Sequence, residues 1–552
     1  MKGLLLAFLL ALSPLASAAQ DCPAAGADFP PLYRNPALFD AALARTDGTT
    51  PWPEPLAAIT VPHHLEAAHL IAGGIRVAAG HSPRRIVLLF PDHFNRAGGG
   101  FATTGRGFDT LFGPVPTDAV GVAHLRRAGI PESCLFGADH GIGAILPFLA
   151  HLLPGVPVVP VALSIRSGKA DWDRLAEALA PLVGPDTLIV QSTDFSHYLP
   201  HHEARLRDQQ VLNILSARDE AALLRLNQPD HVDSLAALYL TLRLTGGRAV
   251  PIVLANQNQQ EFTATPMAET TSYMVIAFAP TDSPVPQSYL GETVLVVGGD
   301  MFLGRHLPRM LSDELVARRV TEAALAATGG SPLIVNLEGV ILDELPPDLP
   351  HLTLGMPGDL VSDWAARLNL RAVGLANNHA MDLGAAGLAQ TRAFLAAQGI
   401  ASLSHGEALD LHGLTVVGLR DLSNTEPPYA GLIGKADLDR LLIADAGRPV
   451  VAFFHWGQEY AKDPGARERA LAEEARRRGV ALVIGAHPHR ATDRPEVIGG
   501  GDALVVWSLG NFLFDQTGPE VSGAVVELRV FAQGTVFARQ LPLPDLFGLA
   551  RR

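Results

Sequence analysis

The chain has 552 residues, of which 48% are hydrophobic and 18% charged. It is too long for a single hydrophobic core and too apolar for a disordered protein, so we expect a globular protein of two or more domains. Its formal net charge of -14 argues against nucleic acid as the main partner, because phosphates are recognised by positive surfaces. Cys22 and Cys134 are the chain's two cysteines, which excludes a disulfide scaffold and leaves open one bridge or two free thiols.

The first residues predict export. Lys2 precedes an apolar run from Leu4 to Leu12, and the small residues Ala16-Ser17-Ala18 follow it. This order is typical of a cleaved secretory signal, which we place at 1–19. The apolar run is shorter than the roughly 20 residues that cross a bilayer. We therefore expect secretion across the inner membrane to the periplasm or another extracytoplasmic space, with no stable membrane insertion after cleavage.

Composition divides the rest of the chain into four segments. Residues 20–54 are rich in proline and alanine without a sustained period, so we interpret them as an N-terminal extension. A proline-rich stretch at 280–291 is typical of a linker between domains. It separates two segments, 55–279 and 292–545, that each have a plausible size for one α/β domain.

In the first of these segments, polar clusters follow short apolar runs. Runs at 58–61, 86–90 and 188–190 are typical of buried strands, and ligand sites of α/β sheets lie at the carboxyl ends of such strands. The Asp139-His140-Gly141 triplet opens a segment that looks helical. Two interpretations stay open: a metal or acid–base site, or histidines that are only buried or capping. For the site we select His63 and His93 as metal ligands and Asp194 and His197 as catalytic groups.

In the second segment the same pattern recurs six times. The apolar runs are 294–297, 333–335, 372–376, 450–454, 481–484 and 504–507. Polar residues follow each run, so parallel strands would bring all six clusters to one rim. The potential ligands are Asp300, Asn336, Glu338, Asn378, His455, His487 and His489.

These ligands are oxygens and imidazoles without a thiolate, which suits Mn, Fe, Zn or Mg. Pro488 disfavours a helical conformation of His487, so we expect extended backbone there, with His487 and His489 on one side. Two metals about 3.5–4 Å apart would clamp a phosphoryl-like group and supply the nucleophile.

The second segment resembles the CapA family, whose members are linked to poly-γ-glutamate capsule synthesis or export and look like calcineurin-type metallophosphoesterases. The resemblance covers about 292–530. Its motifs are GDMFLGR at 299–305, NLE at 336–338, NNHAMDLG at 377–384, HWGQEY at 455–460, HPH at 487–489 and SLGNF at 508–512. It implies a calcineurin-like α/β sandwich that binds two divalent metals, Mn, Fe or Zn.

The resemblance also implies individual roles. The implied metal ligands are Asp300, Glu338, Asn378, His455, His487 and His489. His379 would protonate a leaving group or steady the transition state, and Arg305 would neutralise an anionic substrate. We further expect substrate contacts from Asn336, Asn377, Trp456, Glu459 and Asn511. Whether a phosphoester or an amide bond is cleaved stays open.

The first segment resembles the Memo family, also called AmmeMemoRadiSam system protein B, over about 57–279. Its motifs are VPH at 61–63, PDH at 91–93, DH at 139–140 and STDFSHY at 192–198. The resemblance implies an α/β fold related to class III extradiol dioxygenases, with one Fe or other metal. Two departures matter: His64-Leu65 stands where the family usually has Ala-Gly, and no cysteine occurs near Asp233, where the family has one. Asp233 would replace that thiolate, or the pocket is metal-free.

Three functions are compatible with this sequence. The leading one is an exported metal-dependent hydrolase that handles an anionic polymer such as poly-γ-glutamate, or a cell-envelope phosphoester or amide. The second is a non-catalytic binding protein that works with capsule or envelope assembly proteins. The third is iron-dependent oxidation in the Memo-like domain.

Overall fold

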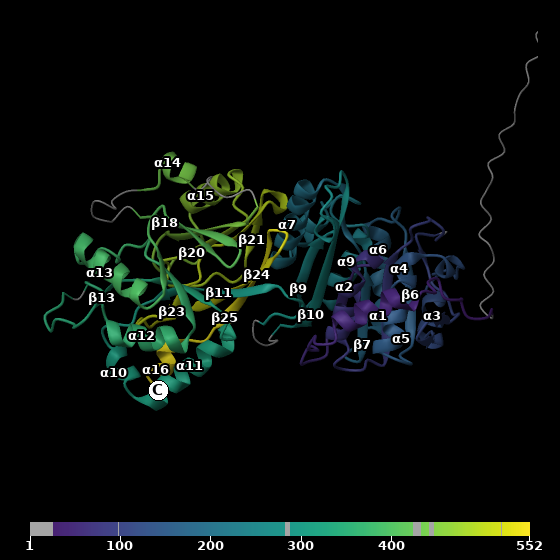
Figure 1. Ribbon diagram of the computed structural model, residues 1–552, viewed down its shortest axis with the longest axis horizontal. Helices are drawn as coiled ribbons and strands as arrows, with labels where there is room; N and C mark the ends of the chain where they lie inside the picture. Colours follow the sequence, from purple (N-terminus) through teal and green to yellow (C-terminus); the bar gives the residue numbers. More distant parts are fainter. Residues whose placement is uncertain are drawn as a thin grey trace, which may run out of the picture.

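The computed structural model describes residues 26–97, 99–281, 287–350, 352–422, 432–440, 447–519 and 521–552. The predicted signal segment 1–19, Cys22 and the central part of the predicted linker, 282–286, lie outside these residues. Figure 1 shows two α/β bodies side by side, one coloured purple to teal and the other teal through green to yellow. The predicted class, two α/β domains, is confirmed.

The N-terminal domain is built on one mixed sheet with the order β3-β6-β2-β7-β1-β10-β8, and β9 pairs with β10. Strands β6, β2, β7 and β1 are parallel, whereas β10 is antiparallel to β1. The strands are β1 (Ala58–Val61), β2 (Arg85–Pro91), β3 (Phe101–Ala102), β6 (Val158–Leu163), β7 (Thr187–Ser192), β8 (Phe195–Leu199), β9 (Ala249–Asn258) and β10 (Thr270–Pro280). The three predicted apolar runs are therefore neighbouring strands β2, β7 and β1, and their carboxyl ends meet at one edge.

Helices pack on both sides of this sheet, and a small hairpin of β4 (Phe108–Thr110) and β5 (Gly113–Val115) lies beside it. The helices are α1 (Pro36–Arg45), α2 (Ala68–Ala78), α3 (Ala119–Arg127), α4 (His140–Gly143), α5 (Leu146–Leu152), α6 (Lys169–Leu179), α7 (His201–Ala217), α8 (Glu220–Leu223) and α9 (Leu235–Thr245). The predicted helical segment after Asp139 is α4, which Asp139 caps by accepting from the Gly141 N–H at 2.8 Å.

The predicted N-terminal extension is partly a piece of the domain core. Helix α1 begins after Asn35, whose side chain accepts from the Ala37 N–H. Its Phe39 and Leu43 are buried, and the Phe39 ring lies 5.2 Å from that of Phe148. The helix buries only one short stripe, which is why no sustained period was visible in the sequence. Cys134 is disulfide-bonded, so of the two alternatives left open by the sequence this cysteine is not a free thiol.

The C-terminal domain has two facing sheets. The first has the order β16-β15-β12-β11-β24-β25 with β23 paired to β11, and the second has the order β17-β18-β19-β20-β22-β21. The first contains β11 (Thr293–Met301), β12 (Leu333–Leu337), β15 (Leu370–Gly374), β16 (Ala401–Leu403), β23 (Asn511–Leu513), β24 (Gly523–Phe531) and β25 (Thr535–Leu543). The second contains β17 (Ala408–Leu411), β18 (Leu414–Asp421), β19 (Val450–Trp456), β20 (Leu482–Ala486), β21 (Glu496–Ile498) and β22 (Ala503–Val506).

Three hydrophobic cores show that this domain is a four-layer sandwich. One core lies between the two sheets, and the other two lie between a sheet and its outer helices. These helices are α10 (Leu307–Leu311), α11 (Glu314–Thr328), α12 (Gly358–Arg367), α13 (Gly384–Ala397) and α16 (Leu546–Ala550) on the first sheet, with α14 (Lys435–Arg440) and α15 (Ala466–Arg477) on the second. The short pair β13 (Val340–Leu342) and β14 (Gly355–Pro357) lies apart. Because α16 packs into a core, the domain extends beyond the predicted end at 545.

All six apolar runs predicted in the second segment are strands, but they divide equally between the sheets. β11, β12 and β15 belong to the first sheet, and β19, β20 and β22 belong to the second. Parallel pairing within each sheet directs their carboxyl ends the same way. The polar clusters therefore meet at one end of the sandwich.

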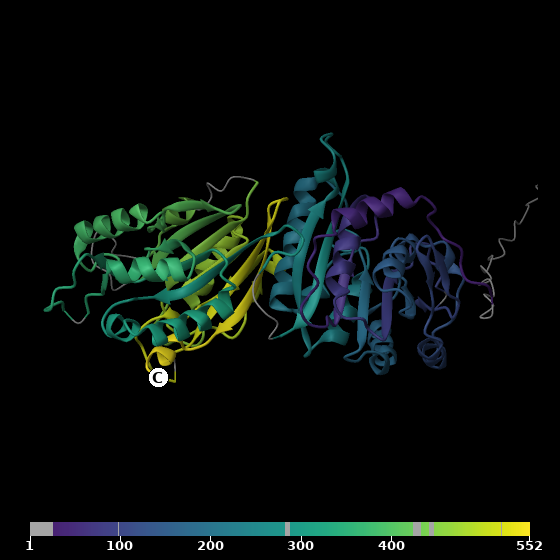
Figure 2. The ribbon, with the colours of Figure 1, turned by 60° about the horizontal axis from the view of Figure 1, so that its bottom comes forward.

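Helix α7 docks the first domain on the edge strand β25 of the second, at the boundary between the two colour ranges in Figure 2. The Gln209 amide bonds both backbone groups of Val536, at 2.8 and 2.9 Å. Gln533 donates to buried Asp208 at 3.0 Å. These contacts cover part of the edge strand β25, which would otherwise be open to pairing with a strand of another chain. No helix among the described residues combines the length and apolar character needed to cross a bilayer.

Candidate metal sites in the two domains

The C-terminal site begins at a close contact between backbones. A side chain at Gly299 would lie 1.9 Å from the Gly510 carbonyl, so only glycine allows β11 and β23 to approach here. The next residue, Asp300, donates its N–H to that same carbonyl at 2.8 Å. Strand register then aligns Asp300 with Asn336 on one side and Asn511 on the other.

Five other predicted ligands converge around Asp300. The ligand atoms of Asp300, Glu338 and His455 all lie within 4.8 Å of one another, and these residues are buried. His489 Nδ1 lies 3.2 Å from Asp300 Oδ2, and the His455 and His487 rings are 4.7 Å apart. His455 Nε2 lies 2.8 Å from the Asn378 Oδ1.

These residues fit a divalent metal. The donors are carboxylate oxygens and imidazole nitrogens, the set that Mn, Fe and Zn take. His487 Nδ1 is buried and has no hydrogen-bond partner, which is costly for a polar atom unless a ligand completes it. His455 Nε2 and Glu338 Oε1 are 3.9 Å apart, a separation that leaves both atoms able to face a common ion.

The backbone of the HPH motif differs from the prediction. His487 has φ 96° and His489 has φ 54°, so both are in the left-handed region instead of extended backbone. Pro488 restricts its predecessor away from the right-handed helical region, but this restriction does not select the extended one. The two rings are nevertheless 6.2 Å apart beside Asp300, so the turn places both near the site.

Burial and neighbouring charges shift the acid–base properties of the cluster. Burial and the nearby Asp300 raise the pKa of Glu338 well above its usual range. Burial and the neighbouring His489 lower the pKa of His487 to about 4, and burial with His487 lowers that of His455. Burial opposes the charged form of His489, but Asp300 outweighs it and raises the pKa. His455 and His487 are thus neutral at pH 7, the form that binds metals.

His379 and Arg305, the predicted catalytic groups, are both held by carboxylates. His379 Nδ1 lies 2.9 Å from Asp382 Oδ2, which also accepts from the Leu354 N–H. The Arg305 Nη1 lies 3.1 Å from Asp515 Oδ1. The sequence analysis did not select Asp382 or Asp515. Asp382 lies three residues after His379 in the NNHAMD motif, which was a visible signal, whereas the sequence gave no signal for Asp515.

Four of the five predicted substrate contacts, Asn336, Asn377, Trp456 and Asn511, are buried side chains that bond within the protein. Asn336 donates to Asp300 Oδ1 at 2.8 Å, and Asn377 in turn donates to Asn336 Oδ1. The Asn511 Oδ1 faces His489 Nδ1 at 2.8 Å, and the Trp456 indole donates to the Trp507 carbonyl. These side chains support the ligands; Glu459 is the exposed member of the five.

The N-terminal site surrounds Asp233, directly before α9. Its Oδ2 lies 3.1 Å from His63 Nε2, 3.9 Å from His93 Nε2 and 4.0 Å from His197 Nε2. Asp194 Oδ2 lies 3.2 Å from the same His63 nitrogen, and Asp194 Oδ1 accepts from the His63 N–H. The predicted residues of the first domain are therefore brought together, with Asp233 at their centre.

This cluster also fits a metal. Four buried atoms lack a hydrogen-bond partner: His63 Nε2, Asp194 Oδ2 and both carboxylate oxygens of Asp233. The ligand atoms of His63, Asp194 and Asp233 lie within 4.8 Å of one another, as do those of His63, His93 and His140. Burial opposes the charged form of His63, but Asp194 and Asp233 outweigh it and raise its pKa to about 9. Two carboxylates beside one imidazole are a hard donor set, suited to Fe or Mn.

Two histidines of this pocket were not among the selected residues. His64 Nδ1 lies 3.0 Å from Asp194 Oδ2, and the His140 ring stacks on that of His93 at 3.8 Å. Burial and the neighbouring His93 lower the pKa of His140 to about 4. Their positions next to His63 and Asp139 were the available signal. Asp139 orients His93 through a 2.7 Å contact between its Oδ1 and Nδ1.

Comparison with known proteins assigns each domain. The family described as Bacterial capsule synthesis protein PGA_cap matches residues 294–414 and 433–516, and the family described as Memo-like protein matches 59–261. The PGA biosynthesis protein CapA of Bacillus subtilis is 32% identical over 174 residues, which cover 27% of this chain and 44% of that protein.

Two further relatives agree with this division. A MEMO1 family protein of Methanopyrus kandleri is 26% identical over 157 residues, covering 27% of this chain and 55% of that protein. The capsule biosynthesis protein CapA of Bacillus anthracis is 32% identical over 126 residues, which cover 23% of this chain and 26% of that protein. The chain thus spans about half the length, 44% and 55%, of the first two relatives. The chain is a fusion of a Memo-like domain with a PGA_cap domain.

Proposed function

We propose that the protein is an exported, metal-dependent hydrolase whose C-terminal domain cleaves an anionic envelope substrate. The substrate is a polymer such as poly-γ-glutamate, or a cell-envelope phosphoester or amide. The convergence of Asp300, Glu338, Asn378, His455, His487 and His489 at one end of the sandwich carries this proposal. The relatives named for PGA and capsule biosynthesis support the substrate class.

The metal cluster, His379 and Arg305 have different roles in this proposal. The cluster would hold a divalent metal, which when bound would supply Lewis-acid activation of the scissile bond. Asp382 fixes one nitrogen of His379, so that the other nitrogen is available to a leaving group. Arg305, exposed beside Asp515, offers its remaining N–H groups to an anionic substrate.

Purified full chain loaded separately with Mn²⁺, Fe²⁺ and Zn²⁺ tests this function against model phosphodiesters and glutamyl amides. We expect metal-dependent hydrolysis that is lost in His487→Ala. Protein that stays metal-free and inert under every loading contradicts the proposal. Stabilisation by polyglutamate without turnover, unchanged by His487→Ala, would instead identify a binding or assembly protein.

A second function, iron-dependent oxidation, is favoured by one observation in the first domain. One ligand atom from each of His63, Asp194 and Asp233 lies within 4.8 Å of the other two, as in a nitrogen and carboxylate iron site. Oxygen consumption with catechol-like substrates in iron-loaded protein tests it. Consumption that disappears in His63→Ala supports the function, and no consumption in the wild type refutes it.

A further inference from the structure

Helix α7 connects the N-terminal metal cluster with the PGA_cap domain. Its Asp208 is fully buried and accepts hydrogen bonds from both sides. The Ser196 hydroxyl in β8 donates to Asp208 Oδ1 at 2.7 Å, and the Gln533 amide, in the turn between β24 and β25, donates to Asp208 Oδ2 at 3.0 Å. Ser196 lies between Asp194 and His197 in the chain. This path therefore runs from the second domain to the segment that carries two residues of the cluster.

A second path runs through Gln210 of the same helix. Its Nε2 donates to Asp502 Oδ1 in the PGA_cap domain at 2.8 Å, and its Oε1 lies 2.8 Å from His231 Nε2. His231 Nδ1 accepts from the Asn227 N–H at 3.2 Å, so its Nε2 carries the proton and donates to Gln210. His231 lies two residues before Asp233. This path therefore reaches the segment that carries the central carboxylate of the cluster.

The two segments reached by these paths are bonded to each other. The Asp233 N–H donates to the Asp194 carbonyl at 3.1 Å, and the His197 N–H donates to the Pro229 carbonyl at 3.2 Å. These bonds fix the relative positions of Asp194 and Asp233, whose ligand atoms lie with that of His63 within 4.8 Å of one another. A shift of either segment would thus change the spacing of the candidate ligand atoms.

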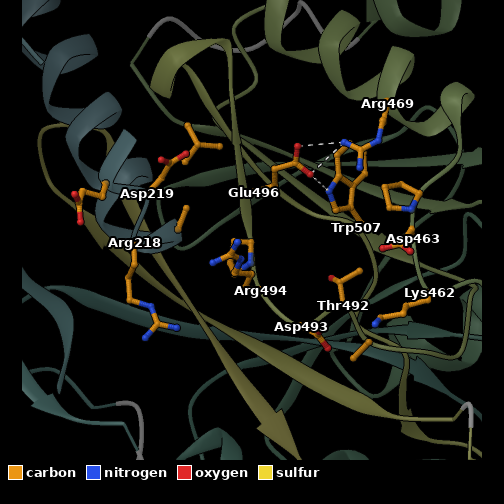
Figure 3. Close-up of a pocket in the computed structure, with 16 residues that line it drawn as sticks. Arg218, Asp219, Lys462, Asp463, Arg469, Thr492, Asp493, Arg494, Glu496 and Trp507 are labelled. Carbon is orange, nitrogen blue, oxygen red and sulfur yellow. Dashed lines mark hydrogen bonds and ion pairs between the residues drawn. The ribbon is translucent and has the colours of Figure 1, made fainter. Parts of the chain in front are cut away.

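The hollow beyond the end of α7 does not join the domains in this way. Residues of both domains line this space of about 460 Å³, which Figure 3 shows. Among the described residues, the bonds of its charged side chains stay within one domain: Arg469 pairs with Glu496 at 3.1 Å, and Asp219 accepts from the Ala222 N–H at 2.9 Å. The paths to the metal cluster therefore run through α7.

We propose that Gln533 and Asp502 of the PGA_cap domain act as positioning residues for the metal cluster of the Memo-like domain. The inference rests on metal binding by that cluster, the site of the second function proposed above. Side chains that orient metal ligands from outside change metal affinity by about 10–100-fold when they are removed. Here such supporting groups come from another domain, so docking of the PGA_cap domain sets how tightly the Memo-like domain binds its ion.

The burial of Asp208 is what makes the coupling effective. Asn256 also donates to Asp208 Oδ2, at 3.0 Å, and Thr535 of the second domain donates to Asn256 Oδ1 at 2.7 Å. A buried carboxylate that loses a donor is destabilised, because water does not readily replace the bond. Loss of Gln533 would therefore draw the remaining donors, Ser196 among them, into a new arrangement.

The test changes the PGA_cap domain and measures the Memo-like domain. The parent is the full chain carrying His487→Ala, which impairs the C-terminal cluster, and the variant carries Gln533→Ala/Asp502→Ala in addition. Co²⁺ is the probe, because its visible absorption reports the ligands around it. We expect at least about tenfold weaker Co²⁺ binding at the N-terminal site, together with a shifted absorption spectrum.

Two further variants of the same parent serve as controls. Ser216→Ala removes another bond between α7 and the second domain, since the Ser216 Oγ accepts from the Ala538 N–H at 3.3 Å. Ser216 has no described bond to segments 194–197 or 227–233, so the Co²⁺ affinity should change by less than about twofold. Asp502→Asn keeps an oxygen that can accept from Gln210 and should likewise leave the affinity unchanged. Thermal unfolding verifies that each variant is folded.

Hydrogen–deuterium exchange of the metal-free proteins gives a second readout. In the double variant, amides of 194–197 and 229–233 should exchange at least about tenfold faster, while those of β2 and β6 exchange as in the parent. A Co²⁺ affinity unchanged from the parent, or exchange that is unchanged or raised equally in β2 and β6, overturns the inference. Parent protein that binds no Co²⁺ at the N-terminal site refutes the metal site, whereas the exchange result still decides whether the second domain positions these segments.

Discussion

The two domains hold histidine–carboxylate clusters of opposite electrostatic character. In the Memo-like domain, His63 faces the carboxylates of Asp194 and Asp233, and they raise its pKa to about 9 despite burial. In the PGA_cap domain, burial of His487 and the neighbouring His489 lower the pKa of His487 to about 4. The same residue types therefore give one site in which His63 holds a proton at pH 7 and one in which His455 and His487 are neutral, the form that binds a metal. The comparison shows that neighbours decide when a histidine cluster can bind an ion.

The largest expected effect separates the two sites by activity. Asp300→Asn keeps the shape of a fully buried side chain but removes the charge at the centre of the C-terminal cluster. We expect phosphodiester hydrolysis to fall by more than about 100-fold, since loss of even a supporting group costs 10–100-fold. Asp233→Asn is the matched change in the other domain and should alter hydrolysis by less than about twofold. Equal losses in steady-state assays of both variants would show that the sites act as one.

The pH dependence of metal binding sharpens the contrast. Because the pKa of His63 is raised, its bound proton stabilises the metal-free fold fully below about pH 6.5, and this contribution is lost as the pH rises through about 9. A metal must displace that proton, so affinity at the N-terminal site should rise about tenfold per pH unit, or about 100-fold from pH 6.5 to 8.5. Competition titrations of His487→Ala, which leaves the N-terminal cluster intact, measure this. An affinity independent of pH would contradict the proton on His63.

Removal of the central carboxylate of the N-terminal site should have a smaller effect. Asp233 faces the Nε2 atoms of His63, His93 and His197, so Asp233→Asn removes one charged donor and leaves the imidazoles. We expect metal affinity at this site to fall about 10–100-fold. Calorimetry in the His487→Ala background isolates the site. Unchanged affinity would show that Asp233 lies near the metal without binding it.

The smallest effect concerns a supporting side chain. Asn511→Ala removes the oxygen that faces His489 Nδ1 at 2.8 Å and frees the ring to turn. One neutral hydrogen bond is worth about 1 kcal/mol, so hydrolysis should fall about tenfold or less. The fall should appear in kcat at saturating metal. A change confined to KM would return Asn511 to the substrate contact predicted from the sequence.

Local patterns were sufficient to predict the strands and the clusters that follow them. All six apolar runs of the second segment are strands, because a run of buried apolar residues ending in polar ones carries its own signal. Contacts between side chains that are distant in the sequence carried no such signal. The burial of Trp456 against Trp507 and the pairing of Asn511 with His489 depend on strands that meet only after folding.

Backbone conformation was equally inaccessible. His487 and His489 have left-handed backbone, whereas the sequence offered only the local restriction by Pro488. The N-terminal extension contains a helix, Pro36–Arg45, that the sequence pattern did not predict. Its amphipathic stripe is short, and burial of Phe39 and Leu43 against the rest of the domain stabilises it.

Anomalous X-ray scattering from crystals of metal-loaded protein tests the central claim most directly, that each domain has its own metal site. At the absorption edges of Mn, Fe and Zn, we predict density among Asp300, Glu338, His455, His487 and His489, and separate density beside His63, Asp194 and Asp233 at pH 8.5. Crystals saturated with each metal that show no density in the C-terminal cluster would contradict the account.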